Sequence, residues 1–369
     1  MIPLVDLKAN YSSIEAEVHE SLKRVLSTTA FILGPDVTEF EKEYAAFVGA
    51  KHCVGVANGT DAVELLIRAA GLEGTDEVLV PANSFIASAL GVQRAGAKVR
   101  FVDCDDDGLI DLESCAARVT KQVKAVLPVH LYGQCAPMEH VERFAASHQL
   151  LIIEDAAQAQ GAKRANRAAG TWGFGAGTSF YPGKNLGAYG DGGGITTNDD
   201  ATAKKLRALR NYGSEVKYLH PEAGFNSRLD TLQAAVLRVK LKRLAEWNAL
   251  RRAAAERYVS LLRGVSDLRL PRVVESNEHI WHLYAVRVPA AVRDAVMKSM
   301  QTAGIGVGVH YPVPIHLQGA YAASGHRPGD FPRAEAQAAE MISLPMYPEL
   351  SADQQAQVAD ALTRALATA

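Results

Sequence analysis

The chain has 369 residues, of which 48% are hydrophobic and 22% are charged, and its formal net charge is -2. This length and apolar content are ample for a buried core and predict two or more structural units. The near-neutral charge argues against a nucleic-acid or membrane-surface partner, and no apolar run reaches the ~18 residues of a membrane span.

The four cysteines form no C-x-x-C pair and match no zinc or iron–sulfur spacing. We therefore expect no metal site, and unpaired thiols in a reducing compartment. The N-terminus has no cationic segment followed by an apolar core, so we expect a cytoplasmic protein.

The first two thirds of the chain alternate between helical and strand-like patterns. Residues 13–27 and 37–49 have the spacing of amphipathic helices, and Asn58-Gly59-Thr60 opens another helix that runs to about Ala70. Short apolar runs predict strands at 52–57, 77–80, 98–102, 124–129 and 150–154. Because helical segments separate several of these runs, the pattern predicts an α/β fold with a mostly parallel sheet covered on both faces.

Residues 170–194 hold ten glycines among aromatic residues and Lys184. This density excludes a long regular helix. The aromatic residues and the β-type stretches on both sides favour close backbone packing around a ligand over a flexible linker.

Apolar residues from about 230 to 264 recur at helical spacing and predict one long helix that leads into a second, smaller domain. The later predicted elements are a strand at 280–288 and helices at 290–304 and 351–368. We therefore expect a large α/β domain over residues 1–245 and a small α+β domain over residues 246–369.

Several polar segments stand where this fold would place a site. Asn58-Gly59-Thr60 lies between a strand and a helix, where free backbone N–H groups bind phosphate, although an ordinary helix cap explains it equally well. Glu154 and Asp155 follow an apolar strand, where parallel sheets bind ligands and where an acid can hold a protonated ring nitrogen. For a lone aspartate, a solvated strand end or a helix cap is the commoner explanation.

Lys184 lies among small, aromatic and apolar residues, from Ser179 to Gly187, whereas Lys204 and Lys205 lie in a charged stretch. Desolvation lowers the pKa of a lysine and helps it form an imine. Gly224 to Asp230, just before the long helix, is by itself only a polar loop and a cap.

Five of these segments in order resemble the DegT/DnrJ/EryC1/StrS family of pyridoxal 5'-phosphate (PLP)-dependent sugar aminotransferases. The resemblance extends from Gly34-Pro35 to Leu344-Pro345-Met346. The motifs are Asn58-Gly59-Thr60-Asp61-Ala62, Pro128-Val129-His130-Leu131-Tyr132-Gly133, Glu154-Asp155-Ala156-Ala157-Gln158, Lys184-Asn185-Leu186-Gly187 with Gly190-Asp191-Gly192-Gly193, and Asn226-Ser227-Arg228-Leu229-Asp230.

The resemblance implies a type I aminotransferase fold, PLP as the cofactor, and an active site shared across a homodimer. It implies that Lys184 carries the cofactor as a Schiff base, that Asp155 holds the pyridine nitrogen, and that Gln158 lies beside the ring and its hydroxyl. The remaining cofactor contacts that it implies are Phe85 stacked on the ring, and Gly59, Thr60, Ser179 and Asn226 of the partner subunit at the phosphate.

Further segments resemble the branch of the family that aminates C3 of dTDP-linked 3-keto-6-deoxyhexoses, with glutamate as the expected amino donor. They are Asn211-Tyr212-Gly213-Ser214, Lys217-Tyr218 and His310-Tyr311-Pro312 with Pro314-Ile315-His316-Leu317-Gln318. Tyr181, His310, Tyr311 and His316 are the candidate sugar contacts, and for each histidine a structural role is an equal alternative.

Other functions remain open at this stage. A relative of the same family could aminate a 4-keto sugar or a scyllo-inosose-type cyclitol. The dehydratases of the family replace the lysine with histidine, and Lys184 argues against that branch. A nicotinamide oxidoreductase would need G-x-G-x-x-G, which residues 173–177 do not match. A non-catalytic PLP-binding regulator would normally carry a DNA-binding module, and no basic helical arm is evident.

Overall fold

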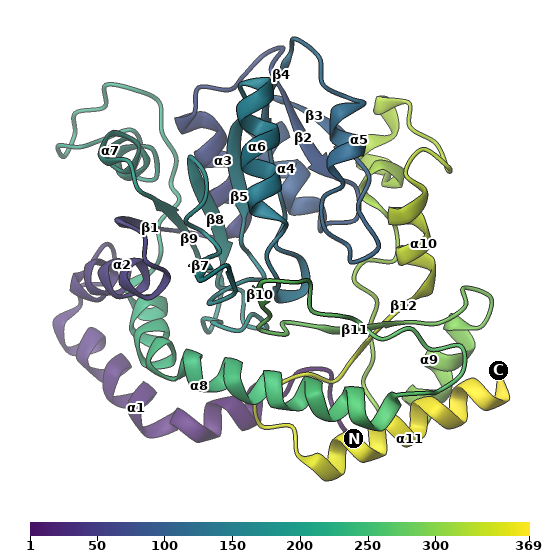
Figure 1. Cartoon of the computed structure of the whole chain (residues 1–369). Helices are drawn as coiled ribbons and strands as arrows, with labels where there is room; N and C mark the ends of the chain where they lie inside the picture. The colour runs from purple at the N-terminus through teal and green to yellow at the C-terminus, as the bar shows by residue number, and fades with distance from the viewer.

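The computed structural model describes all residues from 1 to 369 (Figure 1). Its centre is a seven-stranded sheet with the strand order β1-β9-β8-β5-β4-β2-β3. Strand β9 runs antiparallel to both of its neighbours, and the other adjacent pairs are parallel, which confirms the predicted mostly parallel sheet. The strands are β1 His52–Val56, β2 Glu77–Pro81, β3 Lys98–Val102, β4 Val123–Val126, β5 Leu151–Asp155, β8 Gly175–Ser179 and β9 Gly193–Thr197.

Both faces of this sheet are covered by helices. Val78 and Val80 of β2 pack into the core formed with α3 (Gly59–Ala69) and α4 (Ile86–Arg94). Leu79, between them, packs into the core on the opposite face, formed with α5 (Leu112–Ala116) and α6 (Met138–His148). Successive side chains of a strand point to opposite faces, so a continuous apolar run is what two covered faces require. Figure 1 shows α6 in front of the sheet.

The second layer of the molecule is built around α8 (Thr231–Leu262), which runs along the bottom of Figure 1. The first half of α8 packs against α1 (Leu7–Thr28) and α2 (Pro35–Val48), and α11 (Ala352–Thr368) also packs against α8. The remaining elements here are β11 Tyr284–Arg287, which pairs antiparallel with β12 Met341–Leu344, and α9 Arg293–Thr302. Helix α10 (Pro332–Glu340) packs instead against the large sheet, with Ala334 in the core formed with α3 and α4.

The expected domain boundary after residue 245 falls inside the continuous helix α8, and the division at that residue stays a prediction. Short elements also connect the two layers. Strand β10 (Asn277–Glu278) pairs with β6 (Lys163–Arg164), which pairs with β7 (Arg167–Ala168). Helix α7 (Asp200–Leu209) belongs to the layer of the large sheet, where it packs beside β1 and α3. None of the helices combines the length and the apolar character needed to cross a membrane.

The strand predicted at 280–288 is only partly present, because β11 begins at Tyr284. The preceding residues donate their backbone N–H groups to a 3-10 turn, η1 (Leu131–Gly133): Ile280 N lies 2.9 Å from Gly133 O, and Leu283 N lies 3.3 Å from Tyr132 O. The apolar run therefore packs against a turn, and this turn lies next to the cavity described below.

Candidate active site

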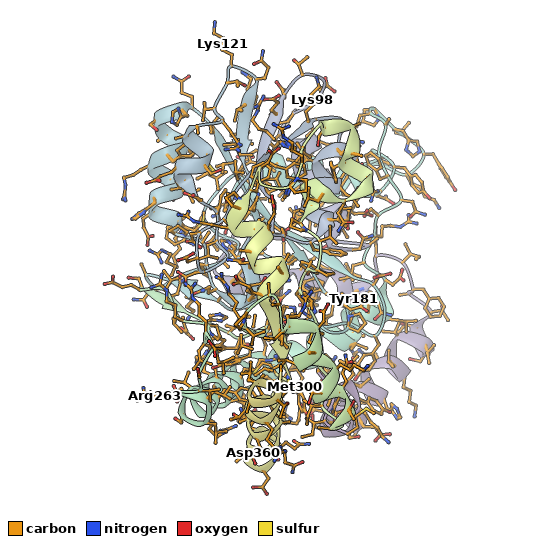
Figure 2. The ribbon with its side chains drawn as sticks, turned by 90° about the vertical axis from the view of Figure 1, so that its right-hand side faces the viewer. Lys98, Lys121, Tyr181, Arg263, Met300 and Asp360 are labelled. Atoms are coloured by element: carbon orange, nitrogen blue, oxygen red, sulfur yellow. The ribbon has the colours of Figure 1, made fainter.

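A cavity of about 530 Å³ opens at the carboxyl ends of β5 and β8. This size lies within the ~300–1,000 Å³ typical of small-molecule sites. Tyr181 stands half-exposed in its wall and lies between the part of the molecule that carries Lys98 and the part that carries Met300 (Figure 2). The predicted residues that line the cavity are Gly59, Thr60, Phe85, Asp155, Gln158, Ser179, Tyr181, Lys184, His310 and Tyr311.

Two predicted residues do not line this cavity. Asn226 is exposed in the segment before α8, so its proposed role in a partner's site stays a prediction. His316, a candidate sugar contact, lies outside this cavity, and its contact with the sugar stays a prediction. Its side chain is fully buried, its Nε2 lies 3.1 Å from Glu335 Oε1, and its ring packs edge-on against Phe331.

The N-terminus of α3 combines a helix cap with free donors. Asn58 Oδ1 accepts a hydrogen bond from Asp61 N at 2.9 Å, as an N-cap does. The N–H groups of Gly59 and Thr60 have no acceptor within the protein and line the cavity. A Cβ on Gly59 would lie 2.7 Å from Ser179 Cβ, so glycine is what allows this close approach. The cap and an anion-binding role are therefore compatible.

Asp155 ends β5 with its side chain toward the cavity. Its Oδ2 accepts from Ser88 Oγ at 2.6 Å, and its Oδ1 accepts from Ala157 N at 3.1 Å. It makes no ion pair. Glu154, one residue earlier, points to the other face and is fully buried. Only one of the two adjacent acids thus reaches the cavity.

Both the oxygen and the nitrogen of the Gln158 amide are hydrogen-bonded. Its Oε1 accepts from Tyr132 N at 2.6 Å, and its Nε2 donates to the Tyr311 hydroxyl oxygen at 3.2 Å. The Tyr311 ring in turn lies 5.1 Å from the Phe85 ring, between centroids. These contacts define one wall of the cavity with two aromatic rings and one oriented amide.

Lys184 reaches the cavity from the loop between β8 and β9, and its amine makes no hydrogen bond or ion pair. Burial lowers the pKa of Lys184 to about 8, and the nearby Asp155 carboxylate opposes this shift. The backbone is fixed next to it, because Asn185 Nδ2 donates to Asn248 Oδ1 at 2.9 Å and to Ile280 O at 3.1 Å. The site thus holds an amine of which about a tenth is neutral at pH 7, far more than of an ordinary exposed lysine.

The sequence of the chain matches the DegT/DnrJ/EryC1/StrS aminotransferase family over residues 12–363. The chain belongs to this family. The match confirms the predicted family, and with it an aminotransferase of the PLP-dependent class. It also excludes the alternative of a nicotinamide oxidoreductase.

Two relatives are similar to this chain over almost their whole length. The dTDP-3-amino-3,4,6-trideoxy-alpha-D-glucose transaminase of Streptomyces venezuelae is 43% identical, over 98% of this chain and 95% of its own. A protein of Geobacillus stearothermophilus named pleiotropic regulatory protein is 44% identical, over 97% of both chains.

Solved structures of the family agree with the fold. S. venezuelae DesV in complex with a ketimine intermediate superposes with a TM-score of 0.96 at 43% identity, over 98% of both chains. NtdA of Bacillus subtilis, solved with the bound cofactor PMP, superposes with a TM-score of 0.90 at 30% identity, over 99% of this chain and 83% of its own.

The sequence did not single out His282, which also lines the cavity. Its Nδ1 lies 3.2 Å from Asn185 Oδ1, and burial, with Lys184 nearby, holds the pKa of His282 well below its ordinary value. The pKa of His310 is lowered to about 4 for the same two reasons. Both imidazoles are therefore neutral at physiological pH. Because residues 280–288 were expected to form a regular strand, His282 was not considered as a site residue.

Proposed function

We propose that this aminotransferase moves an amino group from an amino acid, L-glutamate, to C3 of a dTDP-linked 3-keto-6-deoxyhexose, with PLP as the cofactor and Lys184 as the catalytic lysine. The observation that carries the proposal is the pairing of Lys184 and Asp155 in one cavity. The amine is unpaired and has a pKa lowered to about 8, and the acid keeps free acceptor capacity.

The residues around the cavity fit PLP group by group. The free N–H groups of Gly59 and Thr60 at a helix N-terminus suit its phosphate. Ser179 Oγ accepts from Tyr181 N at 3.3 Å, which leaves the hydroxyl proton of Ser179 free to donate to the same phosphate.

The wall of the cavity suits the ring. Asp155 would hold the ring nitrogen, Gln158 would lie beside the ring hydroxyl, and Phe85 would stack on the ring face. Each of these side chains lines the same cavity as Lys184.

When bound, PLP supplies an aldehyde for the amino donor and a ring that accepts electron density from the donor's α-carbon. Lys184 Nζ, once free and neutral, would take the proton from the donor's α-carbon and deliver it to C4' of the cofactor, acting first as general base and then as general acid. Asp155 keeps the ring nitrogen protonated through a charge-assisted hydrogen bond. Leu4, Val63 and Leu283 add apolar side chains to the wall of the cavity.

The sugar would occupy the outer part of the cavity. Tyr181, His310 and Tyr311 supply hydroxyl and imidazole groups there, and the imidazole of His310 is neutral. Neutral donors and acceptors suit sugar hydroxyls, which carry no charge. The transaminase named above, 43% identical over its length, supports a dTDP-3-aminosugar product.

The substrate assignment is tested by assaying dTDP-linked 3-keto and 4-keto sugars side by side, with scyllo-inosose as a third acceptor and glutamate as the donor. We expect the 3-keto sugar to have the highest kcat/KM. Preference for the 4-keto sugar or for the cyclitol would overturn the C3 assignment while leaving the aminotransferase in place.

We further propose a homodimer in which Asn226 of the partner subunit reaches the phosphate. Asn226 is exposed and lies outside the cavity of its own chain, which is what a contribution to a second site requires. Sedimentation velocity should give a dimer. A fully active monomer would contradict this proposal.

The G. stearothermophilus relative named a pleiotropic regulatory protein motivates a second candidate, a non-catalytic PLP-binding regulator. Such a protein would use the same unpaired amine to attach PLP, so Lys184 by itself does not separate the two candidates. Turnover of a keto-sugar with glutamate decides between the two: PLP binding without any turnover across the acceptor panel would favour the regulator.

A further inference from the structure

Two serine hydroxyls form a short chain that ends on Asp155. Ser84 lies just before α4 and Ser88 lies in its first turn, and their Oγ atoms are 2.7 Å apart. Ser88 Oγ lies 2.6 Å from Asp155 Oδ2. All three residues are buried, and all three line the cavity.

The direction of this chain follows from the acceptor at its end. An ionised carboxylate only accepts hydrogen bonds, so Ser88 must give its single hydroxyl proton to Asp155. The Ser88 oxygen then accepts from Ser84, which gives its own proton to Ser88. Asp155 Oδ1 accepts from Ala157 N at 3.1 Å, so both carboxylate oxygens are tied to the protein.

A buried carboxylate is usually compensated by an ion pair, and in Asp155 these hydrogen bonds take over that role. Burying a carboxylate is costly unless its charge is compensated, and Asp155 makes no ion pair with any lysine or arginine. Hydrogen bonds to the charged form of an acid stabilise it, in addition to the electrostatic interaction with nearby Lys184. They also fix the plane of the carboxylate, so its free lone pairs point in one direction.

We propose that Ser88, oriented by Ser84, is a positioning residue that keeps the Asp155 carboxylate aimed at the ring nitrogen of the cofactor. This inference rests on the proposed function. Helix α4 carries none of the predicted catalytic groups. Through Ser88 it would nevertheless influence how strongly Asp155 binds the ring nitrogen.

The experiment measures dissociation constants of the apoprotein for pyridoxamine 5'-phosphate, which has no aldehyde and so cannot bond to Lys184. Removing a hydrogen bond to a charged group should weaken binding by about tenfold or more in Ser88→Ala. Ser88→Cys, nearly the same size but a weak donor, should lose a similar factor. Ser84→Ala should lose about two- to threefold, because the bond from Ser88 to Asp155 remains.

A second ligand separates positioning from general support of the fold. In 1-deazapyridoxamine 5'-phosphate a C–H group replaces the ring nitrogen, so Asp155 has nothing to hold. The wild type should bind it more weakly than pyridoxamine phosphate, and Ser88→Ala should bind it as the wild type does, within about twofold.

Equal losses for both ligands in the Ser88 variants, or no loss for pyridoxamine phosphate, would overturn the inference. A wild type that fails to bind pyridoxamine phosphate at all would overturn the proposed function instead. The two failures are therefore distinguishable. Thermal unfolding of each apoprotein checks that the variants are folded.

Discussion

Glu154 and Asp155 are adjacent at the end of β5, yet their surroundings differ in one decisive respect. The two Glu154 oxygens accept four hydrogen bonds, from His130 Nε2 and from the backbone N–H groups of Gly170, Trp172 and Gly173. A carboxylate has about four acceptor sites, so Glu154 is saturated. Asp155 accepts two and keeps the rest for the cavity. Saturated buried acids hold structure, and unsaturated ones at a cavity are available to a ligand.

The buried lysines Lys184 and Lys240 differ in the same way as the two acids: one amine already has a partner, and the other does not. Burial lowers the pKa of each to about 8. The amine of Lys240 donates to Gly187 O at 2.7 Å and lies 4.5 Å from the centre of the Tyr189 ring, whereas the amine of Lys184 has no partner. A lowered pKa alone therefore does not separate the two lysines; the missing partner does.

The largest effect that tests this contrast is expected for Lys184→Ala, which should lower transamination by about a thousandfold or more, because it removes the amine that moves the proton. Lys240→Met is the matched control and should keep activity within about tenfold. Steady-state amination of the keto-sugar measures both. Full turnover by Lys184→Ala would refute the assignment.

Substituting the two acids should have opposite consequences: Asp155 should affect catalysis, and Glu154 should affect stability. Asp155→Asn should lower kcat by about 100-fold and change the free energy of unfolding little. Glu154→Gln should instead lower the free energy of unfolding by about 2–4 kcal/mol, because it faces buried donors with an amide N–H group. Urea unfolding and kcat are measured on both variants. The same profile in both would show that acceptor saturation does not distinguish their roles.

The pKa of Lys184 predicts a pH dependence. Below about pH 8 the amine is increasingly protonated, so the rate at which apoprotein attaches PLP should rise about tenfold per pH unit and level off above pH 8. In Asp155→Asn the midpoint should move down, because the Asp155 charge raises the pKa of Lys184. Stopped-flow absorbance measures the rate. A midpoint that moves up in the variant would contradict the electrostatic coupling.

The smallest effects should separate two histidines. His310→Gln should raise KM for the sugar severalfold, because His310 lines the cavity. His316→Gln should leave KM unchanged within about twofold and lower the free energy of unfolding by about 1 kcal/mol, through its bond to Glu335. If His316→Gln raised KM as much as His310→Gln does, His316 would have to be regarded as a sugar contact.

The amino-acid sequence by itself determined the alternation of strands and helices, the cap at Asn58 and the family. These properties depend on spacing within a few residues, or on motifs in a fixed order. The same local information predicted one strand over 280–288, where tertiary contacts with the turn at Leu131–Gly133 leave residues 280–283 outside the sheet.

Only the tertiary structure decided which polar groups share the cavity. Spacing does not distinguish His310 from His316 or Asp155 from Glu154, and it does not reveal His282 or Ser88. Their roles depend on which face of an element meets the space between the layers, and on which hydrogen bonds are already taken. Those partners are supplied by segments that lie far away in the chain, so local pattern carries no record of them.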